Sequence, residues 1–159
     1  MHINISSRNI IRTAQLLSAA AIITACSIMY FYRKIHELAG MQWFKTDTQS
    51  FEVPIENPTR LDGHLIIRHV EGYQHNNLTV HLLSMKDGEL WMDEHIAIPI
   101  KDENGDYVGA GSVDLWDVEH LIFESKTLSK GTYTFEVSHT MQQDRLPLVM
   151  EVGLVLEEV

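Results

Sequence analysis

The feature that most constrains the fold is a two-residue alternation of apolar and polar side chains after residue 40. It is clearest in residues 132–141, where one face carries Tyr133, Phe135, Val137 and His139. Turn sequences such as those at 86–89 and 103–106 separate these runs, and no helical periodicity appears among them. The pattern predicts an all-β domain, an antiparallel β-sandwich of jelly-roll or Greek-key type with roughly eight strands.

One local motif predicts a feature of the sandwich topology. Leu128, Gly131 and Tyr133 have the L-x-x-G-x-Y spacing of a tyrosine corner. In such a corner the tyrosine hydroxyl binds backbone a few residues upstream and fixes a crossover between sheets. We therefore expect these three residues to be structural.

The N-terminus has the composition of an export signal. Residues 13–32 contain no charge and follow Arg8 and Arg12. About twenty uncharged residues can also span a bilayer as a helix, so an uncleaved N-terminal anchor is the alternative. Both interpretations place the following domain outside the cytoplasm.

A lipid-attachment site is predicted at the only cysteine, Cys26. The preceding Ile23, Thr24 and Ala25 resemble the lipobox of bacterial lipoproteins. In that chemistry the thiol receives diacylglycerol and a peptidase cuts after Ala25. Acyl chains, palmitate among them, then bury enough methylene groups for stable anchoring.

The predicted organisation is a signal peptide or anchor helix at 1–25, a lipid-anchored tether at 26–40 and a β-sandwich at 41–159. Ser27, the residue after the cysteine, resembles an outer-membrane sorting signal. Residues 28–32 contain no acidic cluster of the kind that directs lipoproteins to the cell surface. We expect an outer-membrane lipoprotein that faces the periplasm.

Charge is distributed unevenly along the chain. All 22 acidic residues and ten of the 12 basic residues follow Cys26, so that part carries 10 − 22 = −12. An acidic domain repels nucleic acid, which we exclude as a partner.

The sequence offers no convincing metal site. His69, His75 and His81 fall on separate predicted elements, without ligand spacing. A single cysteine also excludes a cysteine-rich zinc site and an intramolecular disulfide.

A calcium loop is also poorly matched. Residues 102–106 begin like one, with Asp102, Asn104 and Asp106. Tyr107 stands where such a loop needs glycine, and Val113 where it needs glutamate. A hairpin turn explains the same residues, and we expect no metal and no cofactor.

Aromatic residues provide two hypotheses about binding. A sugar-binding face is one use for the set Trp43, Tyr73, Trp91, Tyr107 and Trp116, although core packing is the commoner role. A partner-binding patch around Trp91-Met92 and Leu115-Trp116 is the other. A catalytic motif is absent from the sequence, and a hydrolase with two carboxylates is the least favoured class.

Several short motifs, in order, resemble the GldH-type gliding-motility lipoprotein family of Bacteroidetes. They lie at residues 40–47, 51–55, 102–111, 131–141 and 146–156. The resemblance implies an outer-membrane lipoprotein required for gliding and the linked secretion machinery, and it implies no catalytic residues. The leading hypothesis is a non-enzymatic accessory lipoprotein that binds envelope proteins and no small molecule. The alternative is a tethered glycan-binding module.

Overall fold

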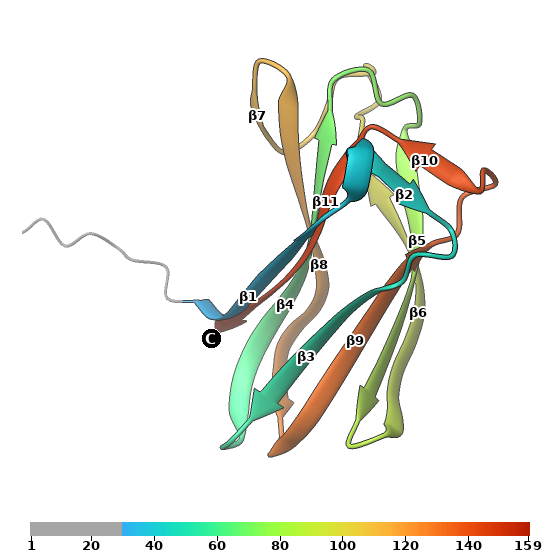
Figure 1. Cartoon of the computed structure of the whole chain (residues 1–159). Coiled ribbons are helices and arrows are strands. Elements are labelled where there is room, and N and C mark those ends of the chain that lie inside the picture. The colour runs from blue at the N-terminus through green and yellow to red at the C-terminus, as the bar shows by residue number, and fades with distance from the viewer. Residues whose placement is uncertain (1–29) are drawn as a thin grey trace, which may run out of the picture.

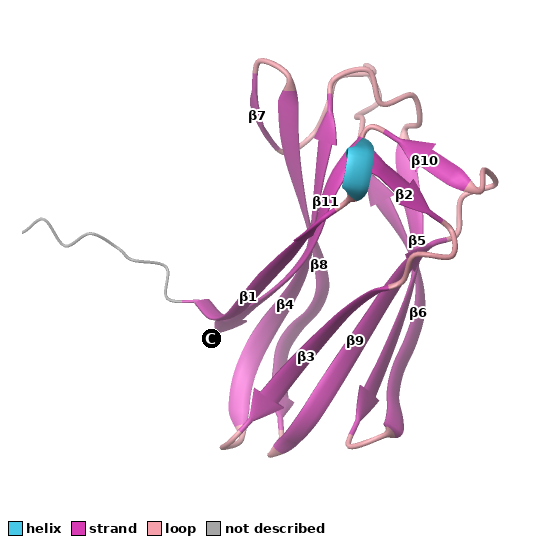
Figure 2. Cartoon of the chain, viewed as in Figure 1, coloured by secondary structure: helices cyan, strands magenta, loops and turns pink. Residues whose placement is uncertain are grey.

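Residues 30–159 are described by a computed structural model in which nearly all regular structure is β-strand (Figure 2). The predicted signal segment 1–25 and the lipobox with Cys26 lie outside these residues. Among residues 30–159, no helix is long and apolar enough to cross a membrane.

Two antiparallel sheets form the body of the domain. The first contains, in spatial order, β1 (Tyr30–Glu37), β11 (Val149–Glu158), β4 (Thr59–Val70), β8 (Leu115–Leu128) and β7 (Ala110–Ser112). The second contains β3 (Gln49–Ile55), β9 (Gly131–His139), β5 (Asn77–Lys86) and β6 (Glu89–Pro99). A two-stranded sheet of β2 (Gln42–Phe44) and β10 (Arg145–Pro147) lies at one end, and the 3₁₀ turn η1 (Ala39–Met41) connects β1 to β2.

The pairing of the long strands is that of a jelly roll. Four antiparallel pairs are nested in the chain: β1 with β11, β3 with β9, β4 with β8, and β5 with β6. This is one long hairpin rolled up so that its pairs alternate between two sheets (Figure 1). The predicted antiparallel β-sandwich is confirmed.

The core lies between the sheets and follows the alternation in the sequence. Every second residue of β9, from Tyr133 to His139, is buried, as are alternate residues of its sheet neighbour β5, and β11 of the other sheet supplies buried side chains from the opposite side. The predicted turn at 86–89 joins β5 to β6, with positive φ at Asp87 and Gly88, as a type I′ hairpin turn requires.

The N-terminal boundary of the domain differs from the expectation. Most of the segment expected as a tether, 26–40, forms strand β1 and η1, and β1 pairs with β11 along its length. His36 fixes β1 to the other sheet, since its Nδ1 lies 3.0 Å from Gln49 Oε1 and its ring stacks on Phe51. Charged residues in this segment obscure the alternation expected of a strand. Its pairing partner, β11, lies at the far end of the sequence, so no local pattern indicates the pairing.

Gly63 on β4 provides space for an aromatic ring in the core. A methyl group at this position would overlap the ring carbons of Phe123 on the paired strand β8. Phe123 is nearly buried and packs against Trp91 and Phe135. The glycine therefore serves close packing.

Replacing Gly63 with alanine should destabilise the domain by about 1–3 kcal/mol, because a well-packed core accepts extra volume only with strain. Equilibrium denaturation of Gly63→Ala, Phe123→Leu and the double variant would measure the coupling between the two sites. The double variant should cost less than the sum of the two single changes. Additive costs would show that the ring is not what excludes the methyl group.

Candidate functional site

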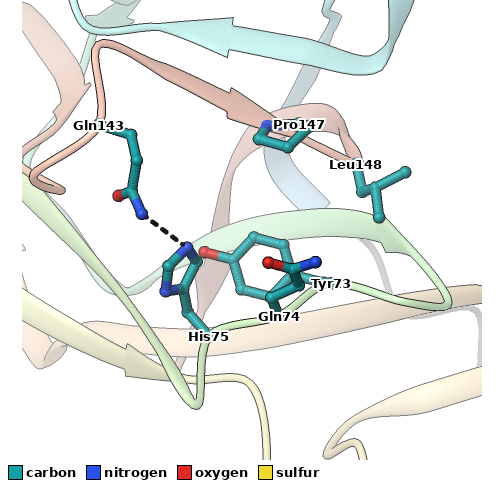
Figure 3. A pocket seen from close by; sticks show the side chains of 6 residues that line it. All are labelled: Tyr73, Gln74, His75, Gln143, Pro147 and Leu148. Carbon is teal, nitrogen blue, oxygen red and sulfur yellow. Dashed lines mark hydrogen bonds between the residues drawn. The ribbon is translucent and has the colours of Figure 1, made fainter.

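A cavity of about 420 Å³ lies at one end of the sandwich, between the β4–β5 connection and the segment around β10 (Figure 3). Its lining residues come from two segments far apart in the sequence: Tyr73, Gln74, His75, Gln143, Pro147 and Leu148. The lining contains no carboxylate, amine, guanidinium or thiol group. Apart from the His75 imidazole and the Tyr73 phenol, the polar side chains of the lining are the amides of Gln74 and Gln143, and such a surface suits binding of an uncharged group.

Tyr73 is the most buried residue of this lining, with 2% of its surface exposed. Its hydroxyl is buried and has no hydrogen-bond partner among residues 30–159. Burial raises the pKa of Tyr73 above its usual range, so the phenol stays protonated and can donate a hydrogen bond.

His75 and Gln143 bring the two sides of the cavity together. The Gln143 side-chain nitrogen lies 3.3 Å from His75 Nε2 (Figure 3). Figure 3 also shows the Tyr73 hydroxyl directed toward the side where these two residues meet. The His75 ring is 5.5 Å from the Tyr73 ring, in an edge-on arrangement. Because Gln143 is exposed and the contact is long, these side chains can move at little cost.

An aromatic cluster packs against the lining residue Tyr73. The His69 ring lies 5.5 Å from Tyr73 and 4.9 Å from Tyr107, and the Tyr107 ring is 5.4 Å from Trp116. The Tyr107 hydroxyl accepts a hydrogen bond from the Gly72 amide at 2.8 Å and donates one to the Tyr73 carbonyl at 3.2 Å. This cluster therefore holds the backbone of the β4–β5 connection.

His69 is fully buried within that cluster. Burial lowers the pKa of His69 below its usual value. One ring nitrogen, Nδ1, lies 3.1 Å from the Val70 carbonyl, and Nε2 has no partner among the described residues. The folded domain therefore favours the neutral imidazole.

Leu148 enters the cavity from a strained backbone position. It has a φ of 67°, which is uncommon for a residue other than glycine. Its amide donates to the Met41 carbonyl and its carbonyl accepts from the Val70 amide, at 2.8 and 2.9 Å. Two other segments, η1 and the end of β4, thus hold Leu148 in place.

The structure does not bring the two predicted partner-binding tryptophans together. Trp91 packs nearly perpendicular to Phe123, Tyr133 and Phe135, with ring centroids 5.1–5.9 Å apart, and Lys126 covers it. Trp116 instead lies beside Tyr107, near the cavity. Both indoles are half-buried. They are therefore separate features, and neither Trp91 nor Trp116 stands free on the surface.

The proposed sugar-binding set is similarly dispersed. Trp43 is fully buried, and its Nε1 donates to the Asp47 carbonyl at 2.8 Å. Tyr73 is buried as well. These rings therefore offer no exposed row of aromatic faces on which a sugar ring could stack.

The aspartate-rich segment 102–106 forms a hairpin turn. One Asp102 oxygen accepts from the Asn104 and Asp106 amides, at 2.8 and 3.0 Å. The backbone hydrogen bond from Asp106 is the main cause of a lowered pKa for Asp102.

The predicted tyrosine corner has the right position but lacks its hydrogen bond. Leu128 ends β8 in the first sheet, and Tyr133 is buried near the start of β9 in the second, so the motif does span a crossover. Gly131, with a φ of 150°, begins β9. Among residues 30–159, however, the Tyr133 hydroxyl has no backbone partner within hydrogen-bonding distance. Tyr133 therefore contributes its ring, which packs on Trp91.

Most of the cavity was not predictable from sequence motifs. Tyr73 and His75 drew attention as residue types, but Gln74, Gln143 and Leu148 carry no local signal. Their proximity depends on the pairing of β2 with β10 and of β4 with β11.

Comparison with protein families matches residues 30–156 to the family described as GldH lipoprotein. Comparison with curated protein sequences gives no match. Among solved structures, the chain is similar to dimeric latent PorU from Porphyromonas gingivalis, with a TM-score of 0.32 and 8% identity over 82% of this chain and 13% of that chain. It is also similar to the infectious bursal disease virus VP2 subviral particle, with a TM-score of 0.35 and 14% identity over 80% of this chain and 33% of that chain. The chain thus spans only a small part of either structure.

Removing the Tyr133 hydroxyl should have little effect on stability. Tyr133→Phe should change the free energy of unfolding by less than about 0.5 kcal/mol, because no hydrogen bond is lost. Tyr133→Ala should cost about 3–5 kcal/mol, because it removes a buried ring. Urea denaturation of both variants would measure this, and a cost above about 1 kcal/mol for the phenylalanine variant would restore the hydrogen-bonded corner.

Stability should fall as pH is lowered from 7 to 5, in part because of His69. The unfolded chain takes up a proton near the usual pKa of histidine, whereas folded His69 resists protonation down to its lowered pKa. Between these two pKa values the unfolded state binds more protons, by up to about 1.4 kcal/mol per pH unit for one group. His69→Phe should show a shallower dependence in this window, measured by denaturation at several pH values. Parallel curves for the two proteins would contradict the assignment.

Proposed function

Because the chain belongs to the GldH lipoprotein family, we propose that it is a non-enzymatic accessory lipoprotein of the gliding-motility and secretion machinery. The observation that carries the proposal is the extent of the match, which begins at Tyr30 in β1 and ends at Leu156 in β11. The matched region is therefore the jelly roll itself. Membership implies a membrane-associated protein of the cell envelope, and the outer membrane with a periplasm-facing domain is the location we propose.

The proposed anchor is a lipid on Cys26. Only four residue steps separate Cys26 from Tyr30 (30 − 26 = 4), so the chain between them reaches at most about 14 Å. Such an anchor would keep the start of β1 close to the bilayer. Because the domain begins at Tyr30 and not at residue 41, most of the predicted tether at 26–40 belongs to the folded domain.

This anchoring would direct the cavity away from the membrane. Strand β1 has eight residues and so extends roughly 26 Å from Tyr30 to η1 and β2. Strand β2 pairs with β10, whose Pro147 lines the cavity. Figure 1 shows η1, β2 and β10 at the end of β1 that lies away from Tyr30. The cavity, which is lined by Pro147 of β10, would thus lie at the end opposite the anchor. There it is available to periplasmic parts of a larger assembly.

The proposed role is binding without catalysis. The cavity lining contains no serine, threonine, cysteine, lysine or carboxylate side chain, and the family resemblance implies no catalytic residues. Tethering instead raises the local concentration of the domain near membrane complexes. An accessory protein that positions or stabilises other envelope proteins fits these properties.

Metabolic labelling with a palmitate analogue should mark the wild-type protein and not Cys26→Ser. Mass spectrometry should find the mature N-terminus at Cys26, and membrane fractionation should place the protein in the outer membrane. Ser27→Asp is the matched control, since it should keep the lipid but shift the protein to the inner membrane. An intact segment 1–25 in the purified protein, with equal labelling of both forms, would favour an uncleaved helical anchor.

The accessory role needs a separate readout in cells. Crosslinking in intact membranes should join the anchored protein to the same envelope proteins in repeated experiments, and Cys26→Ser should lose these products. A released Cys26→Ser protein that still supports secretion fully would contradict a role that depends on anchoring.

A further inference from the structure

We propose that the cavity at the β10 end binds an uncharged segment of a partner polypeptide, which places one apolar side chain against Pro147 and Leu148 and hydrogen-bonds the Tyr73 hydroxyl. The inference rests on the proposed function, because it names the surface with which the accessory protein would bind its partner.

The first argument is the unsatisfied hydroxyl of Tyr73. Buried polar groups in folded proteins are nearly always paired, and an unpaired one is unfavourable. Tyr107, in the same region, has both a donor and an acceptor. Among residues 30–159 the Tyr73 hydroxyl has neither, although Tyr73 lines a cavity with space for a ligand group. A carbonyl oxygen of a bound segment would supply the missing acceptor once the Gln143 and His75 side chains move apart.

The second argument is the absence of carboxylate, amine and guanidinium groups. A charged ligand group would lose hydration in the cavity, and among the lining side chains only the His75 imidazole could carry a counter-charge, when it is protonated. The described domain is acidic, which further disfavours an anionic ligand. Pro147 and Leu148 offer apolar contact instead, and Leu148 is held rigidly by its backbone bonds.

The third argument is the match between glutamine side chains and peptide groups. Gln74 and Gln143 each carry an amide that both donates and accepts, as a backbone peptide unit does. A sugar would need exposed aromatic faces, but the Tyr73 ring is buried and the His75 ring lies edge-on to it, 5.5 Å away. These features together favour a peptide over a glycan.

A second route for a polypeptide, pairing with the edge strand β6, is disfavoured by the structure. Glu94 pairs with the buried Leu82 and so lies on the inward face of that edge. The register between β5 and β6 also shifts beside Ser84, which leaves Trp91 as an extra residue in the edge strand. Inward charges and bulges are the features with which natural sheets prevent strand addition.

The test uses the full chain purified in detergent and two-dimensional amide NMR. The probes are a neutral capped tripeptide, acetyl-Ser-Leu-Ala-amide, its charged counterpart acetyl-Glu-Leu-Glu-amide, and N-acetylglucosamine. The neutral peptide should shift resonances of residues 72–76 and 142–149 in a saturable way, and the charged peptide should bind several-fold more weakly. No saturable shift with the neutral peptide, or binding of the sugar in its place, would overturn the proposal.

Two matched tyrosine variants separate binding from stability. Tyr73→Phe should weaken peptide binding roughly threefold to tenfold, the effect of one hydrogen bond, without loss of thermal stability. Tyr32→Phe is the control, because Tyr32 on β1 also has a buried hydroxyl with no partner within the described part of the chain, but it does not line the cavity. Equal effects of the two changes on binding would contradict a specific role for Tyr73. If the peptide fails to bind while the crosslinks in cells persist, the accessory role stands and its binding surface lies elsewhere.

Discussion

The pairing of β1 with β11 is the interaction on which the remaining architecture depends. It joins the first and last described strands, so it forms only when the chain between them has rolled into two sheets. The pairing is close at Gly153, where a Cβ atom would lie 3.0 Å from the Ile35 side chain. It also brings His36 to Gln49 and Phe51 and closes that side of the sandwich. Because the pairing spans almost the whole domain, its loop-closure entropy must be offset by the core that forms at the same time.

The opposite side of the sandwich is closed differently, and this explains the role of Trp91. Strands β6 and β8 are not paired with each other, so the core between them needs a cover. Trp91 provides it, with Phe123 from one sheet, Phe135 and Tyr133 from the other, and Lys126 across its outer face. From the sequence alone, a tryptophan in this position is a candidate for binding a partner. In the structure, the apolar surface of Trp91 excludes water from the core between β6 and β8.

The sequence predicts the parts of this structure that depend on local pattern. Alternation in residues 132–141 predicted β9 with its inward face, and the turn at 86–89 predicted the β5–β6 hairpin, because side-chain direction and turn type are set within a few residues. Strand β1 was missed because its character depends on β11, at the far end of the chain. The hydroxyl of Tyr133 shows the same limit, since its motif fixes the position of a ring but not the atoms that surround it. The cavity could not be predicted from the sequence for a similar reason, because the two segments that line it come together only through long-range strand pairing.

The location of the cavity follows from the backbone at that end of the sheets. Regular strands satisfy their own polar groups, whereas connections between sheets must find other partners. The β4–β5 connection does so through the Tyr107 hydroxyl, and the segment before β11 does so through Leu148 at positive φ. Side chains of His69, Tyr73 and Trp116, each with a buried polar atom that has no partner among residues 30–159, lie in this region. A binding surface built from neutral groups has a physical advantage for an acidic protein in the envelope. Its contacts depend little on ionic strength, whereas steering by exposed charges weakens as salt screens them. A partner recognised through such a cavity would bind with similar strength over a range of salt concentrations.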